Sequence, residues 1–180
     1  MNHRPLVSVG IALYRSDFLE NLINTLKNQT YKNVEYIVSI DSPDNPIIQT
    51  LITDFQSSVN NVKVYTHRPS LGSLKNYDFT YKKSTGDYFI RLDDDDSFKN
   101  NTHLETLVNK LNEGYDYVFP NVDVEEWQDG KHIDTRKNTM RCYENCVSKF
   151  DFTKASFEES AFIFYSMFRI DSLKIIYYYL

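Results

Sequence analysis

The chain lacks the glycine-rich motifs with which many nucleotide-binding proteins hold phosphate groups. Neither G-x-G-x-x-G nor G-x-x-x-x-G-K-S/T occurs anywhere in its 180 residues. Dinucleotide-binding and P-loop mechanisms therefore lose their main support in the sequence. Any phosphate that this protein binds must be neutralised by a metal ion or by isolated basic residues.

The chain also has fewer basic than acidic residues, with 20 Lys and Arg against 25 Asp and Glu and a formal net charge of −5. Proteins that bind nucleic acid through its backbone need clustered basic residues, so we expect no nucleic-acid partner. The sequence has no positively charged leader before an apolar core, and no apolar stretch near the roughly 20 residues that span a bilayer. We expect a cytoplasmic protein, with peripheral membrane association left open.

Cysteine is nearly absent. Cys142 and Cys146 are the only two, and no His-Cys cluster with zinc spacing accompanies them. The pair could lie on one helical face as reduced thiols or form a disulfide. We favour reduced thiols, which agree with a cytoplasmic setting.

Apolar residues are plentiful, and strand and helix patterns alternate through the first 120 residues. With 41% hydrophobic residues, the chain is expected to form a single domain with a real core. The nearly continuous apolar run 6–13 predicts a buried strand, and Asp17 is expected to cap a helix that ends at Asn28. The same reading predicts further strands and helices, namely strands at 34–40, 62–66, 88–92 and 115–119 and helices over 46–55, 73–83 and 102–112.

This alternation predicts an α/β fold. The central sheet should be mostly parallel and doubly wound, with helices on both faces. Ligands bind such sheets outside the carboxyl ends of the strands. Polar residues that directly follow a predicted strand are therefore the first candidates for a functional site.

Four consecutive aspartates, Asp93 to Asp96, follow the predicted strand 88–92. Adjacent carboxylates repel one another, so at the end of a buried strand they need a counter-charge, most simply a divalent cation that prefers oxygen ligands. We expect a metal that carries a diphosphate. The alternative is a solvated loop or a helix start, with Asp96 and Ser97 capping a helix near Asn101.

Asp41 directly follows the predicted strand 34–40. Two acidic strand ends of one parallel sheet should face one crevice. Asp41 could then accept hydrogen bonds from a base or sugar while Asp93 and Asp95 hold the metal. The alternative for Asp41 is a local role in forming the turn before Pro43.

Five segments of the chain together resemble the N-terminal half of family 2 glycosyltransferases, which have the GT-A fold. They are PLVSVGIALY (5–14), LKNQTYKNVE (26–35), IDSPD (40–44), GSLKN (72–76) and GDYFIRLDDDD (86–96). The last one resembles the family's strand that ends in D-x-D-D. The segments occur in order across most of residues 5–120, which is more specific than any one motif.

The resemblance implies a GT-A, Rossmann-like domain over residues 1–180, with a nucleotide-sugar-binding half (1–120) and an acceptor-side half (121–180). It implies transfer of a sugar from a nucleoside diphosphate sugar, with UDP-sugars favoured, to a hydroxyl of a glycan, lipid-linked or protein acceptor. Mn²⁺ or Mg²⁺ would assist, held by Asp95 and Asp93. On the family pattern the residues expected to bind the donor are Ala12, Tyr14, Asp41, Lys75, Asp93 and Asp94.

Lys75 departs from the family pattern, which more often has arginine at this position. Lysine keeps the charge and loses the bidentate fork. The catalytic base of inverting members lies well downstream of the D-x-D, where Glu158 and Glu159 form the only late acidic pair. Segment 165–173, however, resembles the part of the family that precedes the base. The base is therefore expected either at this pair or beyond Leu180, in which case the chain is truncated.

Two other classes of function stay open on the sequence. One is a binding module that holds a nucleotide-sugar or glycan without turnover. The other is a nucleotidyltransferase, which normally has a glycine-rich phosphate loop near its first strand. In the second half of the chain, residues 127–131 predict a hairpin, in which Trp127 could stack on a sugar or, as we favour, pack in an ordinary way.

Overall fold

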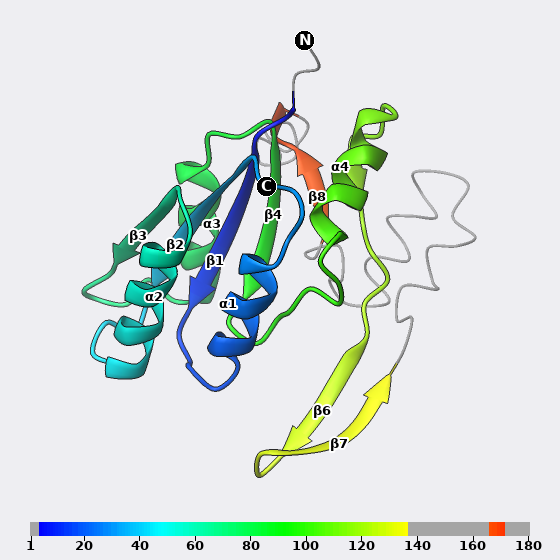
Figure 1. The fold of residues 1–180 in the computed structure, drawn as a ribbon. Helices are drawn as coiled ribbons and strands as arrows, with labels where there is room; N and C mark the ends of the chain where they lie inside the picture. Colours follow the sequence, from blue (N-terminus) through cyan, green and yellow to red (C-terminus); the bar gives the residue numbers. More distant parts are fainter. Residues whose placement is uncertain (1–3, 137–165, 172–180) are drawn as a thin grey trace. The chain divides into compact units, whose positions relative to one another are not determined.

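The computed structural model describes residues 4–136 and 166–171. The chain divides into two compact units, one made of Met1–Val118 with Met167–Leu180 and the other of Phe119–Ser166. The first unit contains a six-stranded sheet with the order β3-β2-β1-β4-β8-β5 (Figure 1). The expected division into a donor half and an acceptor half remains a prediction.

Four parallel strands make up most of this sheet. β1 (Val7–Leu13) pairs with β2 (Val34–Ile40) on one side and with β4 (Tyr88–Asp93) on the other, and β3 (Val62–Thr66) pairs with β2. The strands predicted in these four places are confirmed, each to within one residue at its ends. The mostly parallel α/β sheet is thereby confirmed as well.

Two short strands complete the sheet beyond β4. β8 (Met167–Arg169) runs antiparallel to β4, and β5 (Tyr117–Val118) runs antiparallel to β8. The strand predicted over 115–119 therefore exists but has only two residues. Its neighbour in the sheet comes from a distant part of the chain, which no local pattern around residue 117 indicates.

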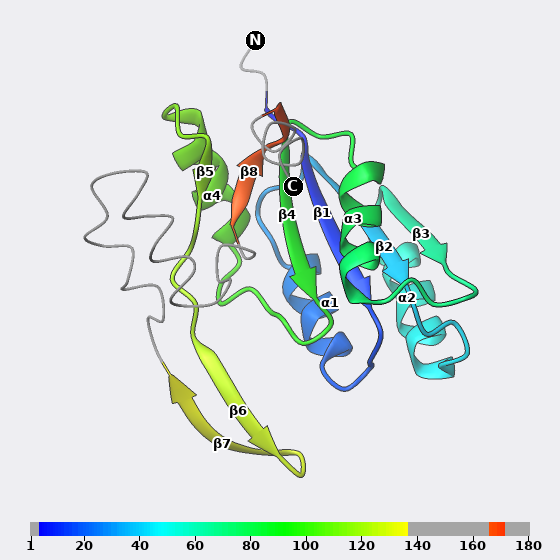
Figure 2. The same ribbon diagram turned by 180° about the vertical axis from the view of Figure 1, so that it is seen from behind.

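Helices cover both faces of the sheet, as predicted. α1 (Leu19–Lys27), α2 (Pro46–Ser58) and α4 (His103–Asn112) cover one face, and α3 (Ser73–Lys83) covers the other (Figures 1 and 2). Within the described parts of the chain, no helix has the length and apolar character needed to cross a membrane.

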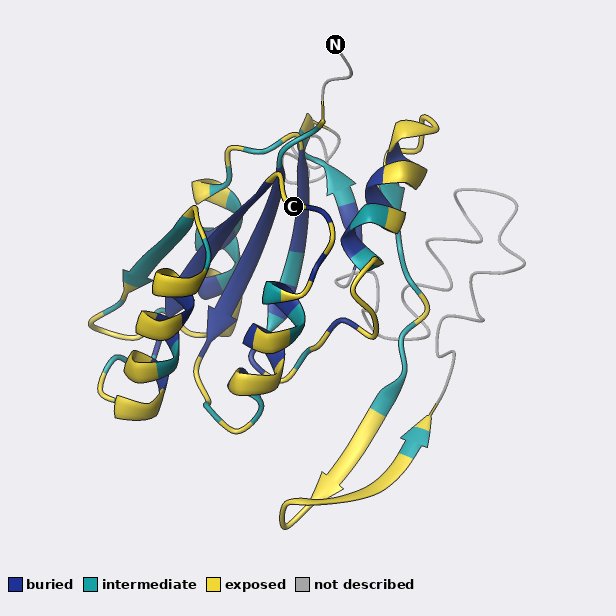
Figure 3. Cartoon of the chain, viewed as in Figure 1, coloured by how far each residue is buried: buried dark blue, intermediate teal, exposed yellow. Residues whose placement is uncertain are grey.

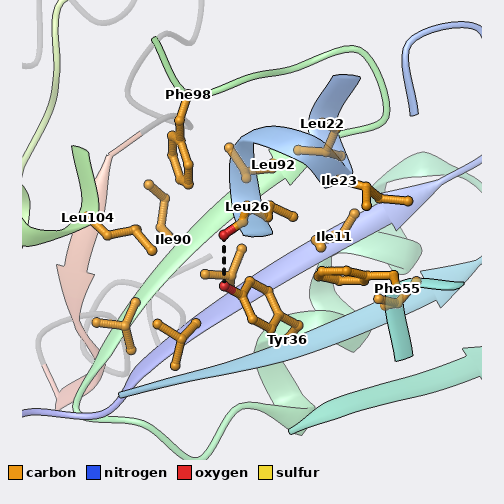
Figure 4. Packing of buried hydrophobic residues seen from close by; sticks show 14 of the residues in the cluster. Ile11, Leu22, Ile23, Leu26, Tyr36, Phe55, Ile90, Leu92, Phe98 and Leu104 are labelled. Atoms are coloured by element: carbon orange, nitrogen blue, oxygen red, sulfur yellow. Dashed lines mark hydrogen bonds between the residues drawn. The ribbon is translucent and has the colours of Figure 1, made fainter. Parts of the chain in front are cut away.

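The main hydrophobic core lies between the sheet and α1, α2 and α4. All seven residues of β1 are buried (Figure 3), and because side chains alternate along a strand, every second one faces this core. Ile11 of β1, Leu22 and Ile23 of α1 and Phe55 of α2 all belong to this core, and Figure 4 shows Ile11 near Ile23. Burying a side chain of this size contributes about 1.5–3 kcal/mol, so the core stabilises the sheet that carries the site.

The opposite face of β1 needs glycine at position 10. A Cβ atom placed on Gly10 would lie 2.5 Å from Thr80 Oγ1 of α3 and 2.8 Å from the Phe89 ring. Neither neighbour has room to move freely, since Thr80 is fully buried and Phe89 lies in β4. Gly10 therefore allows α3 to lie directly on the backbone of the central strand.

The helix starts show one correct and one wrong prediction. α2 begins at Pro46 as expected, and the side chain of Asn45 accepts hydrogen bonds from the N–H groups of Ile47 and Ile48. α1 begins at Leu19 after Phe18, without any side-chain cap, so the prediction that Asp17 caps this helix is wrong. The chain makes a turn through residues 16–19 first, and the helix starts at the first residue whose side chain is buried.

A buried carboxylate joins the amino ends of the strands. Glu35 of β2 accepts hydrogen bonds from Lys63 Nζ at 2.7 Å, Ser8 Oγ at 2.6 Å and the Thr85 N–H at 2.6 Å. Burial raises the pKa of Glu35, but these donors outweigh burial and hold its pKa below the ordinary value. One side chain thus connects β1, β2, β3 and the segment before β4.

The described part of the second unit is a hairpin of β6 (Val124–Gln128) and β7 (Lys131–Arg136). Asp129 and Gly130 both have positive φ, which is typical of the two-residue turns that close hairpins, so the predicted hairpin is confirmed. Trp127 is 44% exposed, with its ring edge-on to His132 and its Nε1 donating to Glu125. Its expected packing role is at most partial.

We expect Glu35→Gln to lower the free energy of unfolding by about 1–3 kcal/mol, because it removes the charge of a buried carboxylate to which Lys63, Ser8 and the Thr85 N–H donate. Because the folded pKa of Glu35 lies below its ordinary value of 4.5, this contribution is present above about pH 4.5 and is lost as the pH falls through the folded pKa. Urea denaturation of both proteins at pH 7 and pH 3 measures this difference.

The matched control is Glu113→Gln, which removes the exposed partner of Lys110. It should change the free energy of unfolding by no more than about 0.5 kcal/mol. Equal stabilities of Glu35→Gln and this control at pH 7 would contradict the structural role of Glu35.

Candidate functional site

The candidate site lies at the carboxyl ends of the parallel strands. Ala12 in β1 lies opposite Asp93 in β4, and Leu13 lies opposite Ile40, the last residue of β2. Residues that directly follow these strands therefore meet at one edge of the sheet. The structure brings Ala12, Tyr14, Asp41 and the four aspartates to this edge, as the alternation of strands and helices predicted.

The first strand ends in one buried and one exposed residue. Ala12 is 8% exposed and presents little more than backbone, whereas Tyr14 is 64% exposed. The backbone of Tyr14 is held on both sides, since its N–H donates to Asp94 Oδ2 at 2.9 Å and its carbonyl accepts from Ser42 Oγ at 2.5 Å. A fixed backbone with an exposed phenol ring can present that ring to a ligand.

Asp41 is buried and accepts three hydrogen bonds from one loop. Oδ1 accepts from the Leu71 N–H at 2.6 Å, and Oδ2 accepts from Ser70 Oγ at 2.6 Å and from the Gly72 N–H at 2.9 Å. Burial raises the pKa of Asp41, but these hydrogen bonds outweigh burial and keep it below its ordinary value.

This contact pattern differs from the local turn that was the alternative for Asp41. The donors lie about 30 residues further along the chain, so the carboxylate anchors the loop that leads into α3. A carboxylate offers about four acceptor positions, of which three are used here. One position remains with which Asp41 could accept a hydrogen bond from a base or sugar.

A buried polar cluster fixes α3 against β2 close to this loop. Ser39 Oγ donates to Asn76 Oδ1 at 2.5 Å and lies 2.8 Å from His67 Nε2, and Asn76 Nδ2 donates back to the Ser39 carbonyl at 3.2 Å. Lys75 is exposed in the first turn of α3. A cation there opposes the helix dipole, so its position does not serve the stability of the helix.

Asp93 ends β4 and carries an unsatisfied oxygen. Its Oδ1 is buried without a hydrogen-bond partner, although Arg91 Nε lies 3.7 Å away. The pKa of Asp93 lies above its ordinary value. Burial raises this pKa by more than the hydrogen bond with the Tyr77 side chain lowers it. A buried carboxylate oxygen that lacks a donor is suited to accept a ligand.

Asp94 belongs to the framework of the β1–α1 loop. It is buried, and its Oδ2 accepts the N–H groups of both Tyr14 and Arg15, the latter at 2.6 Å, while Arg15 Nη2 lies 3.2 Å from Oδ1. Both oxygens are thus engaged inside the protein. Its donor-binding role stays a prediction, and the structure adds that Asp94 positions Tyr14.

The last two aspartates lie in different surroundings. Asp95 has an exposed side chain, and its Oδ2 lies 2.6 Å from Arg15 Nη2. Asp96 is half-buried, accepts the Asp93 N–H at 2.6 Å, and has a pKa that burial raises to about 7. The alternative in which Asp96 or Ser97 caps a helix is wrong, because α4 begins after Thr102.

Arg15 is the site residue that the sequence reading missed. The acidic run was expected to need a metal as counter-charge, yet Arg15 contacts both Asp94 and Asp95. The signal that could have indicated it is its place two residues beyond the end of β1, since the acidic run follows the adjacent parallel strand.

The acidic run at the end of β4 offers carboxylate oxygens, which are ligands that a divalent cation prefers. Among residues 4–136 and 166–171, no group of three or more His, Cys, Asp or Glu side chains is arranged to hold a metal ion. Mg²⁺ and similar ions, however, often use one or two carboxylates with substrate phosphates and water. Asp93, whose Oδ1 accepts no hydrogen bond, and the exposed Asp95 fit such a site.

Several predicted residues lie outside the described part of the chain. Glu158 and Glu159, the candidate bases, are among them, as are Cys142 and Cys146. Of segment 165–173, residues 167–169 form β8 beside β4. The identity of the base therefore stays a prediction.

Solved structures with a similar fold are GT-A glycosyltransferases, which confirms the predicted fold class. S. aureus TarS (1–349) in complex with UDP superposes with a TM-score of 0.70 at 18% identity, over 94% of this chain and 48% of that one. The mannosyltransferase PcManGT of Pyrobaculum calidifontis, in complex with GDP-Man and Mn²⁺, superposes with a TM-score of 0.50 at 17% identity, over 61% of this chain and 32% of that one.

Curated relatives are also glycosyltransferases. The chain is 29% identical over 167 residues to a GalNAc(5)-diNAcBac-PP-undecaprenol β-1,3-glucosyltransferase of Campylobacter jejuni, covering 92% of this chain and 52% of that protein. It is 26% identical over 124 residues to an uncharacterised glycosyltransferase of Methanocaldococcus jannaschii, covering 68% and 40%. The chain thus spans about half the length of the Campylobacter relative and less than half of the Methanocaldococcus relative.

The family model described as "Glycosyl transferase family 2" matches residues 8–172, which is most of the chain. The matched range includes β1 from its second residue onward, all of β2, β3 and β4, and every aspartate at their carboxyl ends. The resemblance seen in the sequence is confirmed, and the chain belongs to glycosyltransferase family 2.

Proposed function

We propose that the protein transfers a sugar from a nucleoside diphosphate sugar to a hydroxyl group of an acceptor, with the help of Mn²⁺ or Mg²⁺. The observation that carries this proposal is the meeting of Asp41, Asp93 and Asp95 at one edge of a parallel sheet, next to the first turn of α3. Membership of family 2 supports sugar transfer as the reaction.

In this proposal Asp41 binds the base or ribose through its one remaining acceptor position. Ala12 and Tyr14 border the same strand end, where the small side chain leaves room and the phenol ring can pack on a flat group. We favour a UDP-sugar because the TarS structures include complexes with UDP and with UDP-GlcNAc. A GDP-linked sugar, as in the PcManGT structure, is the competing donor.

Departure of a nucleoside diphosphate builds negative charge on its phosphate oxygens. A cation held by Asp93 and Asp95 would offset this charge as a Lewis acid. Lys75 and the amino end of α3 add positive potential beside Asp41. The protein's own part is to hold the diphosphate between these groups, in a site whose backbone Asp94 fixes.

The acceptor hydroxyl must lose a proton as it attacks the sugar, and a carboxylate within hydrogen-bond reach is the usual base. We propose Glu158 or Glu159, or a carboxylate beyond Leu180, for this role. The Campylobacter relative is named for a lipid-linked glycan acceptor, so a lipid-linked glycan is the acceptor class that we propose first. Contact with a membrane surface would follow from such an acceptor and remains a prediction.

Turnover of a donor panel tests the proposed reaction. UDP-glucose, UDP-GlcNAc and GDP-mannose are incubated with the protein, Mn²⁺ and an undecaprenyl-diphosphate-linked glycan, and release of nucleoside diphosphate is measured. We expect release from one UDP-sugar, and loss of release when EDTA removes the cation. Binding of a donor without any release is the result expected of a non-catalytic binding module, and equally of a chain whose catalytic base lies beyond Leu180.

Asp95→Asn is expected to abolish the cation-dependent part of UDP binding while the fold stays intact, because the side chain is exposed and leaves no buried group unpaired. Calorimetric titration of UDP with and without Mn²⁺ measures this. Asp54→Asn, at an exposed position of α2, is the matched control and should bind like wild type. An unchanged affinity of Asp95→Asn would overturn the metal assignment.

Asp41→Asn should weaken UDP binding by about 1–3 kcal/mol, the usual cost of a lost buried hydrogen bond, and should spare binding of Mn²⁺ alone. Because Asp41 also anchors the loop 70–72, Ser70→Ala serves as the control that removes one anchor and keeps the carboxylate. UDP calorimetry should show Ser70→Ala near wild type. Equal losses in both variants would mean that Asp41 acts only through the loop.

A further inference from the structure

The acidic end of β4 has a positive partner inside the protein. Arg15 Nη2 lies 2.6 Å from Asp95 Oδ2 and 3.2 Å from Asp94 Oδ1, so one guanidinium bridges two neighbouring carboxylates. The Arg15 side chain is 58% exposed and that of Asp95 44% exposed, whereas Asp94 is buried. The ion pair with Asp95 is therefore open to ions from the solvent.

The backbone of Arg15 is held independently of its side chain. Its N–H donates to Asp94 Oδ2 at 2.6 Å, beside the N–H of Tyr14 at 2.9 Å. The loop after β1 thus keeps its position when the guanidinium moves. Release of Asp95 by Arg15 requires only a rotation of one exposed side chain.

A cation on Asp95 and the present position of Arg15 are incompatible on electrostatic grounds. A Mg²⁺ ion would bind carboxylate oxygens at about 2.0–2.1 Å, so its double positive charge would lie within a few ångströms of the guanidinium. Coulomb repulsion at that distance exceeds the small net value of an exposed ion pair. Arg15 is the partner that gives way, because its pair with Asp95 is the exposed one.

We propose that Arg15 is the counter-ion of Asp95 in the cation-free protein and competes with the cation for this carboxylate. The inference rests on the proposed function, in which Asp95 holds the cation. Its consequence is that a cation alone binds weakly, because it must displace Arg15. A cation that arrives with a diphosphate brings ligands and negative charge of its own, so Arg15 makes cation binding depend on the donor.

The test measures binding of Mn²⁺ alone, as the decrease of the free Mn²⁺ electron paramagnetic resonance signal during titration. Arg15→Gln should bind Mn²⁺ about 2- to 10-fold more tightly than wild type, the range that an exposed pair and the removed repulsion allow. Arg15→Lys keeps the charge and should stay within about 2-fold of wild type. The gain of Arg15→Gln should shrink at 0.5 M salt, because the charges involved are exposed.

Arg4→Gln is the matched control, since Arg4 is also exposed and pairs with Glu105 away from the acidic run. It should leave the Mn²⁺ affinity unchanged. Unchanged or weaker Mn²⁺ binding by Arg15→Gln, in a protein where Asp95→Asn does lose Mn²⁺ binding, would overturn the competition and leave the metal assignment standing. Unchanged Mn²⁺ binding by Asp95→Asn would instead refute the cation site itself, so the two failures are distinguishable.

Discussion

The parallel pairing of β1 with both β2 and β4 is the constraint on which the site depends. Because β1 is hydrogen-bonded on both edges and covered on both faces, its residues are all buried and its register is set. That register determines which residues follow the three strands at the same level. Asp41 and the aspartates after β4 meet Tyr14 and Arg15 for this reason, although 80 positions of the chain separate Tyr14 from Asp94 and Arg15 from Asp95.

Carboxylates at the two ends of the sheet differ in how many hydrogen-bond and ion-pair partners they have. At the amino end, Glu35 has a full set of donors and connects the strands, so its charge serves stability. At the carboxyl end, Asp94 is also fully engaged, but Asp93 keeps a buried oxygen without a donor, and Asp95 has only an exposed partner. An end of the sheet that leaves charge incompletely satisfied is where a ligand can contribute the missing interactions.

Regular structure was predictable where a local pattern carries it. The four parallel strands and α3 agree with the sequence to within a residue or two, since apolar runs and helical spacing report burial directly. The start of α1 was not predictable. Asp17 is a residue type that often caps helices, but the turn before Leu19 determines where this helix begins. β8 could not be inferred from its neighbour β5, because their pairing joins residues about 50 positions apart.

Alternating patterns and contiguous segments of the sequence were enough to predict the family, the mostly parallel α/β fold and the placement of Asp41 and the four aspartates at strand ends. The different roles of those carboxylates depend on the folded arrangement. Asp94 holds the loop after β1, Asp41 holds the loop before α3, and Arg15 pairs with Asp95. The physical reason is that hydrogen bonds and ion pairs depend on distances across the sheet, which no spacing along the chain expresses.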